Sequence, residues 1–461
     1  MNPPTTSAPP PGAATPPPPM APPRGWADLP SDLLSSVADR LHAVAAYVAA
    51  RGVCAAWRSA LPPAAPPFLL MADADSGAAA SALSLSARRA FRLPALPTRT
   101  RCVGSGHGWL AVTGEEAMCY PDTARYRRYP WTTVSYLRRI ALLNPWTGEQ
   151  IVLPYHERLK PSAVIKIAFA PNPRAGDFTV VVASGHASEN HTLAYASTRD
   201  GGGGRGGATW SFVEIDTEKA VLADVVYREG RGGGEDDGGD KVYCLAKNCS
   251  VYVLHLPRGG AAALAPVLEP LLPEPGAFFH PALFFAPIYA RLSVFFTSTS
   301  ARNLVFCDGD LYQIWRNCIG GAVILSSPTG AGDDDRFRVP KDEVFVLRYC
   351  PERLPCWEAV ADLGGHSVFV GPASGAVVVR AAEHVPGLKG DCVYWVSPHE
   401  DRHAMVFDMK TRRCTPCPVP STGRRGGGTT HCWFSLEDTA SSGDDGEEET
   451  LEGQPKRRRI A

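Results

Sequence analysis

The chain has 461 residues, a formal net charge of −1, and 44% hydrophobic and 20% charged residues. A length of this order predicts about two or three domains, and near-neutral charge excludes broad nonspecific binding to nucleic acid, which needs a net basic surface. Thirteen cysteines without a basic-then-apolar leader indicate free thiols in a reducing compartment.

The first segments of the chain predict a tail followed by a small helical module. Residues 1–24 are rich in proline, and we expect a disordered, partly extended tail. Residues 25–62 carry apolar residues at helical spacing and predict short helices. Because about forty residues cannot easily bury enough surface to be stable alone, we expect some apolar side chains to stay partly uncovered and available to a partner. These are Leu29, Leu34, Val53 and Trp57.

Four residue pairs and one single leucine follow one another along this module. They are Leu29-Pro30, Leu33-Leu34, Leu41, Val53-Cys54 and Trp57-Arg58. This order resembles the F-box, the module by which substrate receptors join a Skp-type adaptor in cullin–RING ubiquitin ligases. The resemblance implies adaptor contacts by Leu29, Pro30, Leu33, Leu34, Val53, Cys54, Trp57 and Arg58, although Leu33 is equally suited to an internal core position. An ordinary helical hairpin at a domain edge is the alternative.

Prolines end the last helix, and we expect residues 63–100 to form a transition segment. From residue 101 to residue 435 the sequence changes to short β-like runs separated by turn residues. Hairpins are predicted around Lys247-Asn248, Asp308-Gly309 and residues 371–375. The signal at Asp308-Gly309 is the strongest, because Asp-Gly supplies the positive φ that two-residue hairpins need.

A residue spacing that occurs twice, which we call the internal repeat, favours a repeated β architecture. The same intervals separate Asn144, Thr147 and Pro154 on one side and Asp408, Thr411 and Pro418 on the other. Asx and Thr side chains close such turns by accepting hydrogen bonds from nearby backbone amides. Repeated strand–turn–strand units predict a β-propeller or another closed all-β array, with the number of blades left open.

Four separated motifs strengthen this interpretation, at residues 104–110, 143–148, 362–371 and 386–395. In this order they resemble the β-propeller-like domain of unknown function found behind the F-box in many plant, especially grass, proteins. The resemblance spans about residues 68–420. It implies a multidomain chain, in which a small all-α F-box precedes a mainly-β, propeller-like domain and both termini are disordered.

Motifs for catalysis or cofactors are weak. Gly104-x-Gly106-x-Gly108 precedes a strand-like run, whereas a phosphate-cradling loop precedes a helix. Cys414-x-x-Cys417 with His431-Cys432 has zinc-ligand residue types but lacks a second closely spaced pair, so we expect cysteines on a strand pair. We find no nucleophile elbow or protease signature. We therefore expect no catalytic residue, no cofactor and no metal.

Two further segments bear on location. Residues 276–296 are the most membrane-like stretch, but prolines and charged residues interrupt it, so buried strands and a loop are favoured and no membrane association is expected. In the expected disordered tail of residues 436–461, an acidic run precedes Lys456, Arg457, Arg458 and Arg459, which fit a nuclear import signal. The alternative is a basic tail that no receptor reads. We expect a nuclear protein, with the cytoplasm as a second location.

The sequence thus predicts a non-catalytic substrate-recognition subunit of an SCF-type ubiquitin ligase. Its partners would be a Skp-type adaptor, through it a cullin, and a target protein that the sequence does not identify. Gly52 and an alanine-rich middle loosen the helical module, which motivates the alternative of a nuclear interaction scaffold that does not bind the adaptor. A third possibility is an enzyme or small-molecule receptor that uses the propeller's central face.

Overall fold

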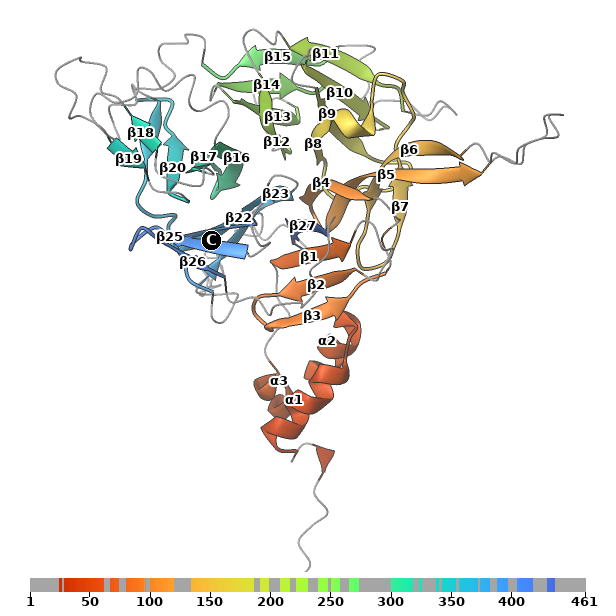
Figure 1. The fold of residues 1–461 in the computed structure, drawn as a ribbon, viewed down its shortest axis with the longest axis vertical. Coiled ribbons are helices and arrows are strands. Elements are labelled where there is room, and N and C mark those ends of the chain that lie inside the picture. Colours follow the sequence, from red (N-terminus) through yellow and green to blue (C-terminus); the bar gives the residue numbers. More distant parts are fainter. Residues whose placement is uncertain are drawn as a thin grey trace, which may run out of the picture.

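The computed structural model shows a small helical module next to a ring of β-sheets (Figure 1). It describes residues 25–26, 29–61, 67–73, 80–94, 96, 100–119, 134–185, 191–198, 208–215, 221–230, 239–247, 250–257, 265–272, 300–317, 323–325, 337–339, 342–353, 356–371, 374–381, 388–396, 404–417 and 429–435. The predicted tails at residues 1–24 and 436–461, the membrane-like stretch at 276–296 and the basic run Lys456–Arg459 lie outside these ranges.

The helical module contains α1 (Ser31–Arg40), α2 (Val44–Gly52) and α3 (Ala55–Ala60), as the spacing of its apolar residues predicts. Pro30 precedes α1, and its carbonyl accepts the first hydrogen bonds of that helix, from the amides of Leu33 and Leu34. Gly52 is the last residue of α2, where it interrupts no helical turn. No helix in the described part of the chain is long and apolar enough to cross a membrane.

Strands of the described residues form six sheets of four or five strands, the blades of a propeller. From the innermost strand outward, blade 1 is β27 (Thr429–Phe434), β1 (Phe68–Asp73), β2 (Ser81–Ser84) and β3 (Arg89–Arg92). Blade 2 is β4 (Arg101–Gly106), β5 (Trp109–Cys119), β6 (Val134–Leu143) and β7 (Gln150–Val152). Blade 3 is β8 (Val164–Phe169), β9 (Thr179–Ser184), β10 (His191–Ser197) and β11 (Ser211–Ile215).

The other three blades complete the ring. Blade 4 is β12 (Leu222–Arg228), β13 (Lys241–Ala246), β14 (Val251–His255) and β15 (Val267–Pro270). Blade 5 is β16 (Ser300–Cys307), β17 (Asp310–Asn317), β20 (Val344–Tyr349) and β21 (Trp357–Ala359), and a separate hairpin joins β18 (Val323–Leu325) to β19 (Phe337–Val339). Blade 6 is β23 (Ser374–Arg380), β22 (His366–Gly371), β24 (Cys392–Val396), β25 (Ala404–Asp408) and β26 (Arg413–Pro416).

The innermost strands β27, β4, β8, β12, β16 and β23 lie next to one another in turn and surround the propeller axis. Close approach between them demands glycine at two positions. A Cβ at Gly104 would overlap the carbonyl oxygen of Ile167, and one at Gly375 would overlap that of Ser105. Glycine is therefore required where these inner strands approach one another most closely.

The ring closes through pairing of the two ends of the propeller sequence. β27 runs antiparallel to β1, with Phe68 opposite Phe434 and Asp73 opposite Thr429. The prediction that residues 63–100 form a transition segment is wrong for β1, β2 and β3, which are three strands of blade 1. The error arises because β1 finds its partner more than three hundred residues away along the chain.

The predicted hairpins are confirmed. β13 pairs with β14, β16 with β17 and β22 with β23, all antiparallel. Asp308 and Gly309 have φ values of 49° and 87°, as the two-residue turn requires. Blade 6 departs from a simple meander, because β22 precedes β23 along the chain and runs parallel to β24.

The internal repeat also has a structural basis. Asn144 Oδ1 accepts hydrogen bonds from the amides of Trp146 and Thr147 at 3.0 and 3.2 Å, between β6 and β7. Asp408 Oδ1 accepts one from the Thr411 amide at 3.0 Å, between β25 and β26. Both Asx turns therefore close the outermost hairpin of a blade.

Candidate functional site

The helical module is fixed to the outer strand of blade 1 (Figure 1). The Tyr47 ring on α2 packs edge-on against Phe91 of β3, with ring centroids 5.3 Å apart. The guanidinium of Arg89 lies 4.9 Å from the centre of the Tyr47 ring and donates a hydrogen bond to the carbonyl of Ala38. The Arg92 amide donates to the His42 carbonyl at 2.7 Å. Module and blade thus share one core.

Two of the predicted adaptor residues belong to this core. Leu34 is 2% exposed and Trp57 is 8% exposed, so the expectation that they stay partly uncovered is wrong. The physical reason is that blade 1 supplies the apolar surface that the small module lacks. Trp57 Nε1 also donates to the carbonyl of Trp26 at 2.8 Å. Leu29 and Cys54 are half-buried against the same cluster.

The other predicted adaptor residues lie on the surface. Leu33 and Val53 are 52% and 57% exposed, and Pro30 and Arg58 are exposed as well. Leu33 is therefore a surface residue and its neighbour Leu34 is a core residue. Val48 on α2 and Trp26 are also exposed, although the sequence did not single them out as contact residues. The module thus presents several large apolar side chains to solvent.

A charged network that the sequence did not reveal joins four blades across the propeller axis. Lys166 of β8 forms an ion pair with Asp224 of β12, and their side chains are 3% and 0% exposed. Asp224 also accepts from the amide of Leu304 at 2.8 Å and from Asn303 Nδ2 at 3.4 Å. Asn303 Nδ2 in turn lies 3.4 Å from the carbonyl oxygen of Gly371. Buried charges of this kind need such partners.

A cavity of about 360 Å³ lies beside this network and is lined by residues of blades 3, 4, 5 and 6. Four cationic side chains line it, together with the carboxylate of Asp224: Lys166, Lys247, Arg302 and Arg316. A smaller cavity of about 170 Å³ is lined by residues of β4, β8, β12, β16 and β23. Lys166 lines both cavities.

His191 forms part of the wall of the larger cavity. The amide of Leu222 donates to its Nδ1 at 3.3 Å, which leaves Nε2 as the protonated nitrogen of the neutral ring. Burial, and secondarily the charge of Lys247, hold the pKa of His191 below its usual value. The imidazole is therefore neutral near pH 7 and presents an N–H donor.

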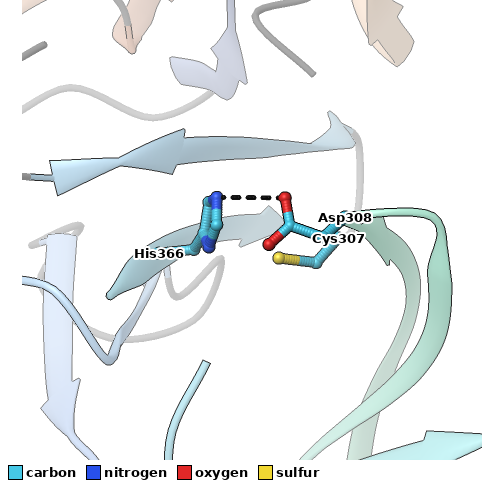
Figure 2. A group of neighbouring side chains, drawn as sticks. All are labelled: Cys307, Asp308 and His366. Atoms are coloured by element: carbon cyan, nitrogen blue, oxygen red, sulfur yellow. Dashed lines mark ion pairs between the residues drawn. The ribbon is translucent and has the colours of Figure 1, made fainter. Parts of the chain in front are cut away.

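A second group of reactive side chains joins blade 5 to blade 6 (Figure 2). The donor atoms of Cys307, Asp308 and His366 all lie within 4.8 Å of one another, with His366 Nε2 3.4 Å from Asp308 Oδ1. His366 Nδ1 lies 3.0 Å from the carbonyl oxygen of Leu363, a contact that orients the ring. Burial, with smaller effects of Asp308 and Asp310, raises the pKa of the Cys307 thiol to about 12.

These three donors fall one short of the four protein ligands of a structural zinc site. A protonated thiol must also lose its proton before it binds a metal. The 3.4 Å contact between His366 Nε2 and Asp308 Oδ1 already accounts for the grouping, since it ties the β16–β17 turn to the first residue of β22. We therefore interpret the group as a link between blades.

The cysteines of the Cys414-x-x-Cys417 motif are separated in space. Cys414, Cys417 and Cys432 pack in three different hydrophobic clusters, and the side chain of His431 lies outside the described part of the structure. Gly104-x-Gly106-x-Gly108 forms the end of β4 and a turn into β5, which confirms the predicted strand after the motif. The turn contains His107 and Gly108 at φ values of 50° and 78°.

Comparison with known proteins now adds to this geometry. Residues 82–412, well over half of the chain, match the model of the KIB1-4 beta-propeller family. The chain belongs to this family. The match agrees with the six-bladed architecture and indicates a protein-interaction or substrate-binding role for the β domain. A search of curated proteins found no match to the chain.

The family match leaves two parts of the molecule outside it. The KIB1-4 model begins within β2 and stops at the turn before β26, so β1 and β27, the strands that close the ring, are beyond its limits. The helical module also precedes it. Any statement about what the module binds therefore rests on its own residues.

Proposed function

We propose that the chain is the substrate-recognition subunit of an SCF-type cullin–RING ubiquitin ligase. In this proposal the helical module binds a Skp-type adaptor and through it the cullin, while the KIB1-4 propeller holds a target protein. The protein makes no covalent bond itself. It raises the effective concentration of target lysines near the ubiquitin-loaded enzyme.

The observation that carries the proposal is the division of apolar residues within the module. Leu34 and Trp57 attach the module to blade 1, whereas Leu33 and Val53 remain more than half exposed, and Pro30 and Arg58 are exposed as well. Large apolar side chains on a small surface, with a charged residue at the rim, are typical of a docking site. We assign adaptor contact to the exposed set, with Leu29 and Cys54 at its half-buried edge.

The shared core between module and propeller supports this role. Contacts among Tyr47, Phe91 and Arg89 hold α2 against β3. An adaptor on the module and a target on the propeller would then be kept at a fixed separation. Such a fixed geometry favours repeated transfer of ubiquitin to lysines in the same region of a target.

The proposal includes a nuclear location, with the cytoplasm as a second one. It rests on the basic run Lys456, Arg457, Arg458 and Arg459, which has the composition of an import signal. A fluorescent fusion of the full chain should accumulate in the nucleus, and replacement of the four basic residues by glutamine should remove that accumulation. Unchanged distribution of the variant would refute this part of the proposal.

Affinity capture of the full chain from cells with the proteasome blocked tests the proposed function. We expect a Skp-type adaptor and a cullin in the captured material, together with a target. The double variant Leu33→Asp/Val53→Asp should lose adaptor and cullin but retain the target. Val267→Asp is a matched control, because Val267 on β15 is 52% exposed and belongs to the propeller. Absence of adaptor from the wild-type capture would contradict the proposal.

The burial of Leu34 and Trp57 also gives some support to a second function, a nuclear interaction scaffold that does not bind the adaptor. With these two side chains inside, fewer apolar anchors remain for an adaptor. Capture of target proteins without adaptor, unchanged in the Leu33→Asp/Val53→Asp variant, would favour the scaffold.

A further inference from the structure

The larger axial cavity has an excess of positive charge. Lys166, Lys247, Arg302 and Arg316 line it, and Asp224 is the one carboxylate among the described residues that line it. Asp342 is not among the described residues that line the cavity, but its carboxylate accepts a hydrogen bond from Arg316 Nη1 at 2.9 Å. When Asp342 is counted as well, these four cationic side chains still outnumber the two carboxylates. Positive charge gathered in a concave, low-dielectric site raises the local concentration of anions.

The two arginines are buried and held in place. Arg302 and Arg316 are 5% and 8% exposed. The Arg302 guanidinium lies 5.4 Å from the Trp315 ring centre, and that of Arg316 lies 5.0 Å from the Trp395 ring centre. A planar guanidinium fixed against a ring can bind a carboxylate or phosphate with little further loss of conformational entropy.

Apolar side chains make up much of the remaining cavity wall. Leu222, Ile314, Val370, Val393 and Val396 contribute aliphatic side chains, and Trp395 adds an aromatic surface. A volume of about 360 Å³ falls within the range of small-molecule sites, which is roughly 300–1,000 Å³. An inorganic ion would leave this apolar surface unused. A molecule with an apolar body and an anionic head would use both parts of the wall.

Lys247 and His191 complete the polar side of the cavity. Lys247 follows β13, lines the cavity and is exposed, so its charge can attract an anion from solvent. His191 is 3% exposed and presents a neutral N–H donor. The cavity therefore combines an attracting charge, buried guanidinium groups and an uncharged donor.

We propose that this cavity binds a small organic anion, a carboxylate or phosphate ester with an apolar body. The propeller would then be a small-molecule receptor as well as a protein-binding domain. This inference goes beyond the proposed ligase function, and no adaptor is needed to test it.

Isothermal titration calorimetry of the full chain tests the proposal with four probes that share an octyl body. Octanoate and octyl phosphate carry anionic heads, octanol is neutral and octylammonium is cationic. We expect at least one anion to bind at least tenfold more tightly than octanol and octylammonium, as charge-assisted hydrogen bonds to arginine imply. The stronger of the two anions identifies the preferred head group. Added salt should weaken binding of the anion, because it screens the attraction between opposite charges.

Three variants locate the binding site. Arg302→Met keeps most of the side-chain volume and should weaken binding of the anion at least tenfold. Lys247→Gln changes an exposed residue without risk to the fold and should weaken binding of the anion roughly twofold to fivefold. Lys160→Gln, at an exposed lysine outside the cavity, should have no effect.

Three results would overturn the proposal. Octanol binding as tightly as both anions would show an apolar pocket without anion preference. No measurable heat with either anion at millimolar concentration would show that no such site exists. Wild-type affinity in Lys247→Gln would place any anion site elsewhere, and this variant decides the question even if Arg302→Met fails to fold.

Discussion

The helical module and the propeller solve the problem of stability in opposite ways. The module is too small to enclose its own core, and it places Leu34, Tyr47 and Trp57 in a cluster shared with blade 1. The propeller closes on itself through β27 and β1 and keeps a buried ion pair near its axis. The module therefore depends on its neighbour, whereas the propeller depends on ring closure.

Because of this difference, the module and the propeller offer different kinds of binding surface. The face of the module that does not contact blade 1 retains exposed apolar residues, which suit a protein partner. The propeller presents charged groups inside a cavity, which suit a smaller ligand or a polar segment.

The largest effect is expected from removal of the closing strand. Deletion of residues 429–461 takes away β27, whose Trp433 and Phe434 are 0% exposed. β1 then loses its partner, the ring opens, and we expect loss of cooperative thermal unfolding for the whole propeller and for the attached module. Deletion of residues 436–461 alone is the matched control and should leave the unfolding transition unchanged. A cooperative transition in the longer deletion would contradict the account.

The next largest effect is expected at the buried ion pair. Asp224→Ala leaves Lys166 charged in the interior and should lower the free energy of unfolding by about 3–5 kcal/mol, measured by urea denaturation. The double variant Lys166→Met/Asp224→Leu should recover much of this loss, because it removes both charges and fills the space. If Asp224→Ala were as stable as the wild type, the network would not stabilise the ring.

A smaller and local effect is expected at the junction between the two regions. Arg89→Met removes the hydrogen bond to the Ala38 carbonyl and the contact over Tyr47. Hydrogen exchange should show that the helices open more easily, by about 1.5–3 kcal/mol, while the inner strands keep their protection. Arg92→Met is the control, because that side chain is exposed on the same strand. Equal exchange in both variants would show that Arg89 does not hold the module.

The smallest effect is a pH dependence that belongs to the propeller alone. Because burial lowers the pKa of His191, protonation of its ring favours the unfolded chain. This contribution to stability is complete above the unfolded pKa of about 6.5 and is lost as the pH falls through the lower folded value. Between pH 7 and pH 5 the wild type should therefore lose more stability than His191→Asn. Parallel pH profiles would contradict this assignment.

Local chemistry made much of the fold predictable. The Asp308-Gly309 turn and the Asx turns at Asn144 and Asp408 are determined by a few adjacent residues, so they could be located from sequence. The three helices followed from spacing. The number of blades could not be predicted, because two Asx turns mark two blades out of six. Pairing of β1 with β27 has no local signal at all.

The candidate sites show the same limit. Leu33 and Leu34 are adjacent, and spacing alone left open that Leu33 is internal, although one side chain faces solvent and the other the core. That choice depends on the position of blade 1. Lys166, Asp224 and Asn303 lie on different blades and meet only when those blades pack side by side. No spacing rule brings them together, so the axial cavity and its charges emerged only from the structure.

Direct binding of the purified full chain to a purified Skp-type adaptor is the decisive test of adaptor docking by the module. We expect the wild type to bind, and we expect Leu33→Asp to lose binding with an unchanged melting temperature, since Leu33 is exposed. Leu34→Ala should instead lower the free energy of unfolding by about 2–5 kcal/mol, as a cavity in the shared core requires. Absence of wild-type binding, or Leu33→Asp binding with wild-type affinity, would contradict the account.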